Sequence, residues 1–342
     1  MSLRPRILLL LPHLGGGGAE KVFALLAQNL SQEKYELHLG LVTQSAVPDD
    51  SVFPAGVTLH LLGARRVRYA LVPLLRLIWK LQPRVILSGM FHLNFLVLLL
   101  RPLFARPVTV LVRQNGTVSA AIASASRPAL TRMLYRVLYR RADRIICQSE
   151  AMAADMRREL GIESGIDPGI NPGKLAVLAN PVDSSAIRGA CSRAFAGASN
   201  EESELGSGLG AGPNLLAVGR LAKEKGFDLL LEALPAVLLR FPSARLVIAG
   251  EGPERTSLES LRRRLGLAPV VDFIGFHQRP AALFGAASVF VLSSRHEGMP
   301  NALLEAAAGG LPLVALPASG GIVDLLRGQP GAWLGRDRKS VV

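Results

Sequence analysis

Two glutamates near the end of the chain, Glu297 and Glu305, stand eight positions apart (297 to 305) and do not share one helical face. The apolar β-branched run 287–294 before them predicts a buried parallel strand. Helical composition over 301–308 follows Pro300, a residue suited to a helix start. Glu297 is therefore expected in the loop after the strand, and Glu305 about one turn into the helix. In open α/β sheets this crevice binds ligands, and a helix start favours anions, so the pair suits a sugar nucleotide.

Two cations follow another predicted strand, over 215–218. Arg220 and Lys225 can both reach the same edge of a sheet. Arginine offers a bidentate fork to a phosphate, and lysine offers a compact charge. Such cations lower the barrier to releasing a nucleoside diphosphate, which gathers negative charge as its bond to the sugar breaks. The alternative is a pair of surface ion pairs with Glu224 or Asp228.

A glycine loop joins the first predicted strand to the first predicted helix at 15–18. Four glycines remove every Cβ, so backbone N–H groups can approach a phosphate or sugar closely. As a dinucleotide fingerprint the loop fails, because Glu20 occupies the place of the third glycine. The alternative is a tight packing turn, since glycine is the usual turn residue.

Four strings of the chain resemble, in the expected order, motifs of the retaining glycosyltransferases of family 4. The string 297–305 resembles the E-x7-E donor motif, and 219–226 resembles the G-R-L…K-G phosphate signature. The loop from His13 resembles the amino-terminal glycine loop of that family. Gly320-Gly-Ile-Val-Asp324 is similar to its GG-I-x-E turn, with Asp in place of Glu. The resemblance covers nearly the whole chain.

This resemblance implies roles for the donor-side residues. Arg220 and Lys225 would bind the donor phosphates. Glu297 would lie near the transferred sugar, and Glu305 would bind the ribose hydroxyls. Further donor contacts are expected from two glycine-containing loops: Gly16, Gly17, Gly18, Gly298, Met299 and Asn301.

On the acceptor side, the resemblance points to Arg113 or Asn115, where related enzymes often carry a histidine. Neither residue is a general base at neutral pH, which agrees with transfer in which the leaving phosphate takes the acceptor proton. No D-x-D pair occurs, and Asp49-Asp50 is interpreted as a turn. We therefore expect no metal and no cofactor, only a nucleotide-diphosphate sugar as co-substrate.

The chain of 342 residues carries a formal charge of +13, which calls for an anionic partner. Nucleic acid is disfavoured, because no recognised module is present and aromatics are 5%. An anionic membrane surface fits better, because basic residues follow two apolar helices, over 69–81 and 128–141. On the second helix a stripe is expected from Arg132, Arg136, Arg140 and Arg144. The alternative is an ordinary solvated helix face.

Several features bear on the expected location of the protein. Its two cysteines, Cys147 and Cys191, are expected to be reduced thiols of a cytosolic protein. The apolar core of 4–12 runs into the glycine loop rather than a cleavage site. The longest apolar stretch, 91–100, is shorter than the roughly 20 residues of a membrane span and predicts a buried helix or strand. We expect a cytoplasmic protein, peripherally bound to the inner face of the membrane.

Alternating strand and helix signals predict an α/β fold, for which two Rossmann-like domains facing across a cleft are the simplest assembly. This assembly matches the GT-B fold that the resemblance implies. The expected boundaries are 1–183 for the acceptor-side domain, 184–213 for a flexible linker or insertion, and 214–342 for the donor-binding domain. Expected strands are 6–11, 36–42, 57–62, 85–87, 108–112, 144–147, 215–218, 244–249, 270–274, 289–292 and 312–316. Expected helices are 19–30, 69–81, 128–141, 150–160, 227–241, 254–265, 280–285 and 301–308. The resembled family usually closes with a long helix, so a carboxy-terminal truncation is expected.

The leading hypothesis is a retaining, metal-independent hexosyltransferase that acts on a lipid-linked or cell-surface glycan in polysaccharide or lipopolysaccharide biosynthesis. One alternative is a sugar-nucleotide epimerase of similar fold, which the E-x7-E pattern disfavours. The other is a non-catalytic, membrane-associated protein that binds sugar nucleotides. The intact set of Arg220, Lys225, Glu297 and Glu305 argues against it.

Overall fold

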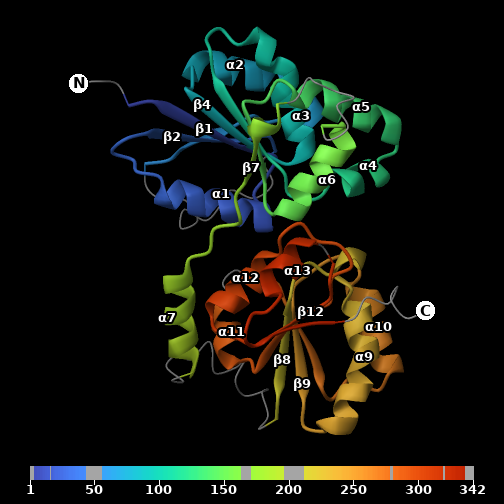
Figure 1. Ribbon diagram of the computed structural model, residues 1–342. Helices are drawn as coiled ribbons and strands as arrows, with labels where there is room; N and C mark the ends of the chain where they lie inside the picture. The colour runs from blue at the N-terminus through green and yellow to red at the C-terminus, as the bar shows by residue number, and fades with distance from the viewer. Residues whose placement is uncertain are drawn as a thin grey trace. The chain divides into compact units, whose positions relative to one another are not determined.

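The computed structural model describes residues 4–15, 17–43, 56–162, 171–195, 212–277, 280–318 and 320–335. The chain divides into two compact units, Met1–Pro181 and Val182–Val342. Each unit is a parallel β-sheet with helices on both faces (Figure 1). This is the predicted α/β architecture.

In the described part of the first unit, seven parallel strands have the order β3-β2-β1-β4-β5-β6-β7. They are β1 (Arg6–Leu11), β2 (Glu36–Leu41), β3 (Thr58–Leu61), β4 (Val85–Gly89), β5 (Thr109–Arg113), β6 (Arg144–Cys147) and β7 (Leu175–Val177). The chain builds the sheet outward from β1 in one direction and then from β4 in the other. The neighbouring strands β1 and β4 therefore mark the switch point of the sheet. Open α/β sheets bind ligands at this point, at the carboxyl ends of the strands.

Successive residues of β1 serve opposite faces, as the two-residue period of a strand requires. Leu9 and Leu11 pack in one core with Phe23 of α1, whereas Leu8 and Leu10 share the other core with α2 and α3. Figure 1 shows α1 on one side of the sheet and α2 and α3 on the other. The helices are α1 (Gly18–Asn29), α2 (Leu71–Leu81), α3 (Phe91–Leu100), α4 (Val118–Ala123), α5 (Pro128–Tyr139) and α6 (Glu150–Leu160), with 3₁₀ turns η1 (Val67–Tyr69), η2 (Arg101–Leu103) and η3 (Pro172–Lys174).

The longest apolar stretch of the sequence forms helix α3. Most of its side chains are buried, and Asn94 donates hydrogen bonds to the backbone carbonyl of Arg113 at 3.1 Å and to the hydroxyl of Tyr139 at 3.2 Å. Within the described ranges, no helix combines the length and apolar character needed to cross a membrane.

In the second unit, the described strands have the order β10-β9-β8-β11-β12-β13 and are all parallel. They are β8 (Asn214–Val218), β9 (Arg245–Ala249), β10 (Val271–Gly275), β11 (Val289–Leu292), β12 (Leu313–Ala315) and β13 (Ala332–Leu334). Here the switch point lies between the neighbouring strands β8 and β11.

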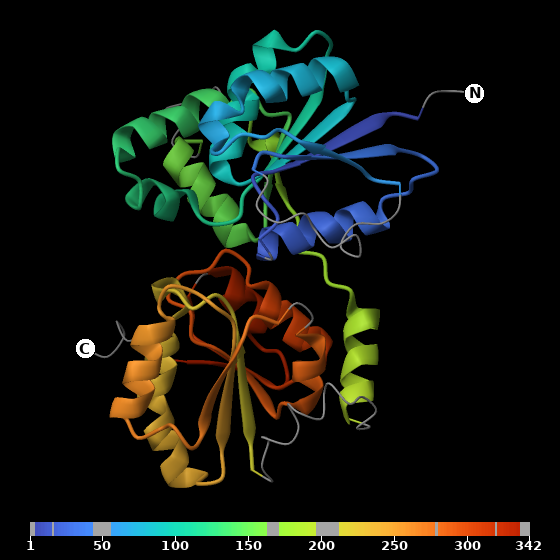
Figure 2. The same cartoon turned by 180° about the vertical axis from the view of Figure 1, so that it is seen from behind.

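Two helices cover one face of this sheet, α9 (Phe227–Arg240) and α10 (Arg255–Arg264). The other face is covered by α7 (Ser184–Phe195), α11 (Ala281–Ala286), α12 (Asn301–Ala308) and α13 (Gly320–Leu326). Figures 1 and 2 show these two groups of helices on opposite flanks. The 3₁₀ turn η4 (Lys223–Lys225) follows β8.

The segment expected to be flexible, 184–213, begins as a regular helix. Helix α7 packs on α11, and Ile187 is buried in the core that contains Phe284 and Phe290. The small residues that suggested mobility are compatible with this close packing. Residues 196–211 lie outside the described part of the chain.

The expected stripe of four arginines on one helix is wrong. Helix α5 ends at Tyr139, and Arg144 is the first residue of β6. Arg132 and Arg136 turn to Glu159 of α6: Arg132 Nε lies 3.2 Å from its carboxylate, and Arg136 Nε donates to its backbone carbonyl at 3.3 Å. Ile145 is buried and Ile146 half-buried in the sheet, and both are β-branched. These residues favour a strand, in spite of the four-residue spacing of the arginines.

Candidate functional site

A lysine and a glutamate meet across the switch point of the second unit. Lys225 ends the turn after β8, and Glu297 lies in the loop after β11. Lys225 Nζ lies 2.6 Å from Glu297 Oε1, and Ser294 Oγ donates to the same oxygen at 2.7 Å. The Glu297 side chain is only 10% exposed. Burying a carboxylate without a partner is unfavourable, so the contacts with Lys225 and Ser294 hold Glu297 in place.

Hydrogen bonds to backbone carbonyls hold the two loops together. Ser293 Oγ donates to the Lys225 carbonyl at 2.9 Å, and Arg295 N donates to the Glu224 carbonyl at 2.7 Å. Gly226 has φ +64°, and a Cβ at this position would collide with the carbonyl oxygen of Ser293. Glycine therefore permits both the left-handed turn and the close approach of the loops.

Arg220 lies beside this pair but is more exposed. Its Nη2 lies 2.6 Å from Glu224 Oε1, and its side chain is 67% exposed. Burial would raise the pKa of Glu224, but the hydrogen bond and charge of Arg220, with Lys225, hold it below its ordinary value. An exposed ion pair contributes about 1 kcal/mol or less, so Arg220 can leave Glu224 for a phosphate.

Arg220 forms a surface ion pair with Glu224, one of the alternatives that the sequence left open. Asp228 instead binds Arg295 through two hydrogen bonds of 2.6 and 2.7 Å. The hydrogen bond from Arg295 is the main cause of the lowered pKa of Asp228. Arg295 also donates to the Lys223 carbonyl at 3.0 Å, so this pair ties the loop after β11 to the turn after β8.

The other predicted donor residues of this unit surround the same loop. Gly298 and Met299 follow Glu297, and Asn301 is the first residue of α12. Glu305 lies in the second turn of α12 and is partly exposed. The expected placement of one glutamate in a loop and the other in the helix matches these positions.

The glycine loop of the first unit is described in part, because Gly16 lies outside the described residues. Helix α1 begins at Gly18, with Gly17 as its N-cap. The buried carboxylate of Glu20 lies 3.3 Å from His13 Nδ1, and a Cβ on Gly17 would collide with it. Gly17 thus makes room for a carboxylate of its own chain. A contact of Gly17 or Gly18 with a phosphate stays a prediction.

The two acceptor-side candidates meet at the end of β5. Arg113 Nη1 donates to Asn115 Oδ1 at 2.7 Å, and its Nη2 donates to Asn180 Oδ1. Burial lowers the pKa of Arg113 to about 10, which still leaves it charged at neutral pH. The described residues pair no carboxylate with this guanidinium. Two amides therefore hold a buried cation at the carboxyl edge of the sheet.

Sequence reasoning missed Ser294 and Asn180. Ser294 orients Glu297, and Asn180 lies 67 positions from Arg113. Ser294 belongs to no recognised motif although it is only three positions from Glu297, whereas the contact of Arg113 with Asn180 arises when distant parts of the chain are placed side by side. Asp49-Asp50 lies outside the described residues. Within the described ranges, no three His, Cys, Asp or Glu side chains form a group suited to a metal ion. Cys147 and Cys191 are both free thiols.

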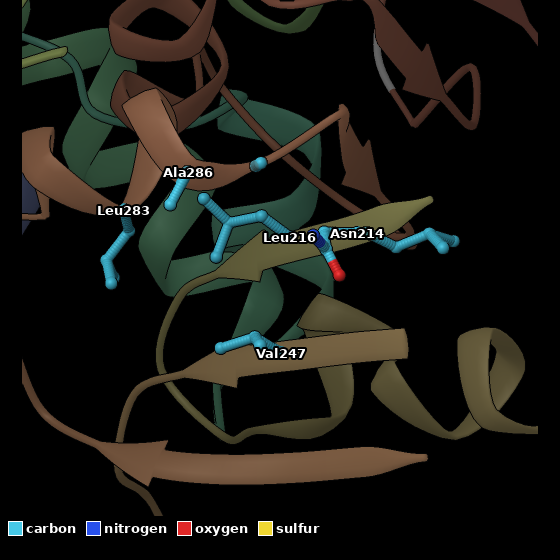
Figure 3. Close-up of a pocket in the computed structure, with 7 residues that line it drawn as sticks. Asn214, Leu216, Val247, Leu283 and Ala286 are labelled. Carbon is cyan, nitrogen blue, oxygen red and sulfur yellow. The ribbon is translucent and has the colours of Figure 1, made fainter. Parts of the chain in front are cut away.

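An apolar pocket of the second unit lies away from this site. Figure 3 shows Leu283 and Ala286, from α11, beside Leu216 and Val247 of the neighbouring strands β8 and β9. Asn214, at the amino end of β8, also lines it. The cavity of about 20 Å³ has room for about one water molecule. It is a packing gap rather than a substrate site.

Comparison with known proteins identifies both units. Residues 17–166 match the family described as "Glycosyl transferase 4-like domain", and residues 212–341 match "Glycosyl transferases group 1". An uncharacterized glycosyltransferase of Haemophilus influenzae is 33% identical over 120 residues, which are 35% of this chain and 34% of that protein. The lipopolysaccharide core biosynthesis glycosyltransferase LpsE of Rhizobium meliloti is 36% identical over 108 residues, which are 32% of this chain and 31% of LpsE. The matched segment is about a third of the length of these relatives.

Solved structures share the fold of the whole chain at low identity. Anabaena HepE, in complex with UDP and glucose, has a TM-score of 0.76 at 18% identity, covering 98% of this chain and 86% of HepE. Sucrose-phosphate synthase from Thermosynechococcus elongatus has a TM-score of 0.72 at 18% identity, covering 97% of this chain and 86% of the synthase. Each unit thus matches a domain family of glycosyltransferases, and the chain as a whole has the GT-B fold.

Proposed function

We propose that this protein is a retaining, metal-independent glycosyltransferase. It transfers a hexose from a nucleotide-diphosphate sugar to a hydroxyl of a lipid-linked or cell-surface glycan. The observation that carries the proposal is the contact of Lys225 with Glu297 at the switch point between β8 and β11, at 2.6 Å. It brings a phosphate-binding cation and a sugar-binding carboxylate together where open α/β sheets bind ligands.

The donor phosphates explain the presence of two cations, Lys225 and Arg220, at this site. As the bond from the anomeric carbon to the diphosphate oxygen breaks, negative charge grows on the diphosphate. Lys225, held in place by Glu297, and Arg220, released from its exposed pair with Glu224, stabilise that charge. The acceptor oxygen bonds to the anomeric carbon on the same face, and its proton passes to the departing phosphate oxygen.

The two glutamates have different tasks in this proposal. Glu297 binds the hydroxyls of the transferred sugar and stabilises positive charge on its anomeric carbon. Glu305 accepts hydrogen bonds from the ribose hydroxyls of the nucleotide. Support for a nucleotide-sugar donor comes from the related fold of Anabaena HepE, which was solved with UDP and glucose.

A membrane-proximal acceptor is supported by the surface of the first unit. On α5, Leu130, Met133 and Val137 are exposed by 41%, 52% and 47% and recur at helical spacing. On α2, Val72 and Trp79 are exposed beside the exposed cations Arg76 and Lys80. Apolar side chains next to cations suit the interface of an anionic bilayer, and each cation adds about 1 kcal/mol near it. We propose peripheral binding to the inner face of the membrane through these two helices.

The test is a panel of UDP-, GDP- and ADP-sugars, with release of nucleoside diphosphate as the readout. The parent protein should turn over at least one donor when membrane glycolipid extract supplies the acceptor. Lys225→Ala and Arg220→Ala should each lower turnover by roughly 10²- to 10³-fold, as loss of a preorganised charge-stabilising group does. Tight donor binding without any turnover would instead favour a non-catalytic binding protein.

A further inference from the structure

The first unit also holds a pocket, which is distinct from the apolar cavity of the second unit. It lies at the carboxyl edge of the sheet and has a volume of about 360 Å³. His13 follows β1, Thr43 follows β2 and His92 follows β4, so the pocket spans the switch point of this sheet. Pockets of about 300 to 1,000 Å³ accommodate small molecules, and the switch point is where they bind.

The titratable side chains that line the pocket are all basic. Two are arginines from the turn after β3, namely Arg66, just before η1, and Arg68, within it. Both arginines precede helix α2 in the sequence and form part of the wall of this pocket. Among the described residues, neither guanidinium belongs to an ion pair, and Arg68 lies over the ring of Tyr69 at 4.9 Å.

Two histidines face the same space. His13 lies 3.3 Å from the buried carboxylate of Glu20. Burial lowers the pKa of His92, and the charge of His13 lowers it further. The pocket therefore already disfavours an additional positive charge. A bound anion would relieve this repulsion.

We propose that this pocket binds a phosphate or carboxylate group of the acceptor, so that the acceptor is an anionic sugar or glycan. The inference rests on the proposed glycosyltransferase function. Guanidinium groups bind phosphate and carboxylate oxygens through two parallel hydrogen bonds, a match that a neutral hydroxyl does not provide. A neutral sugar would dehydrate both arginines without pairing their charge, which is unfavourable.

The test is calorimetric titration of the 342-residue chain with UDP present, so that the donor site is occupied. The probes are glucose 6-phosphate, glucuronate and, as the neutral control, glucose. The parent should bind at least one anionic sugar and not glucose. The phosphate and carboxylate probes show which anion the pocket prefers.

Three variants locate the binding site. Arg66→Gln combined with Arg68→Gln should weaken anion binding at least about tenfold, because each charge-assisted hydrogen bond contributes about 1.5–3 kcal/mol. Arg65→Gln is the matched control, since Arg65 is exposed, adjacent in sequence and not part of the pocket wall. Lys223→Gln should also leave anion binding unchanged, because Lys223 is exposed and not part of the pocket wall. An unchanged UDP affinity shows that the double variant is folded.

Two results would overturn the inference. One is a parent that binds UDP but neither anionic sugar, which leaves the glycosyltransferase proposal standing. The other is an anion affinity that the double variant retains in full. Failure of the glycosyltransferase proposal looks different, because the parent would then bind no nucleotide in the donor panel. In that case an anion bound at Arg66 and Arg68 is not an acceptor, and the acceptor role falls with it.

Discussion

Lys225 and Glu297 are 72 positions apart in the sequence, yet the Lys225 ammonium lies 2.6 Å from the Glu297 carboxylate. Their contact joins the loops of two neighbouring parallel strands, β8 and β11. A donor diphosphate that binds Lys225 therefore also meets the carboxylate proposed to hold the transferred sugar. The predictions below concern this contact, the loops that support it and the surface of the first unit.

The two glutamates should be separable by their kinetics. Glu305→Gln should mainly weaken nucleotide binding, because its proposed contact with the ribose persists through the reaction. Glu297→Gln should mainly lower the rate, because its contact is with the reacting sugar. Steady-state kinetics together with UDP titration would measure both effects. Equal UDP affinity in the parent and Glu305→Gln proteins would remove Glu305 from the ribose.

Gly226→Ala should destabilise the second unit and weaken the donor site. The position combines φ +64° with a collision between the new Cβ and the Ser293 carbonyl. Gly266→Ala is a matched control, with φ +68° and no atom within 4 Å of the new Cβ. The control should lose about 1–2 kcal/mol from left-handed strain alone, and Gly226→Ala should lose more. Thermal melting of both variants checks this, and equal losses would mean that the loops are not in close contact.

The pair of Asp228 and Arg295 should contribute stability that acid removes. The Asp228 pKa lies below its ordinary value of 3.8, chiefly because of the Arg295 hydrogen bond. A depressed pKa gives stability that is present above about pH 4 and is lost as the pH falls through the folded-state value. Asp228→Asn should therefore flatten the decrease of melting temperature below pH 4. The effect should be small, because both side chains are more than a third exposed and solvent screens the pair.

An unchanged acid limb in Asp228→Asn would show that the pair does not stabilise the fold. A double variant that also carries Arg295→Gln should show the same flattened decrease below pH 4 as the single variant, because the pairing with Asp228 is already absent.

Local patterns predicted much of the fold. The bounds of β1, β6, β11, α6 and α12 agree with the sequence prediction residue for residue, because each element has its own apolar period and a clear stop. The prediction left 91–100 open between helix and strand. A segment buried on nearly all sides has no apolar period that would distinguish a helix from a strand. Its tertiary packing then determines which of them forms.

The contacts of the candidate site were less predictable. The motifs identified Lys225 and Glu297, but not that Ser294 would join them or that Arg295 would bind Asp228. The contact of Arg295 with Asp228 depends on placing the loops after β8 and β11 side by side, which no local pattern encodes. Ser294 and Glu297 share one loop, and their contact depends on the conformation of that loop. The arginine stripe failed because its four-residue spacing runs past the end of α5 into β6, the strand that the sequence itself predicted over 144–147.

The exposed apolar row of α5 should contribute to membrane binding. Replacing Leu130, Met133 and Val137 by serine should reduce binding to anionic vesicles, because burying each apolar side chain in the interface is favourable. The matched control replaces Leu239 and Phe241 by serine. These exposed residues lie at the end of α9 in the other unit, so their replacement should have no effect on vesicle binding. Vesicle sedimentation at low salt measures this. A parent protein that stays in the supernatant would contradict the membrane proposal.

The most direct test of the donor site is calorimetric titration of UDP, GDP and ADP into three proteins. These are the parent, Lys225→Ala and the control Lys223→Ala, whose exposed side chain lies in the same turn. The account predicts that the parent binds at least one nucleotide and that Lys223→Ala binds it equally well. Lys225→Ala should bind it at least about tenfold more weakly, a loss of about 1.4 kcal/mol. A parent that binds none of the three nucleotides, or a Lys225→Ala protein with parental affinity, would contradict the account.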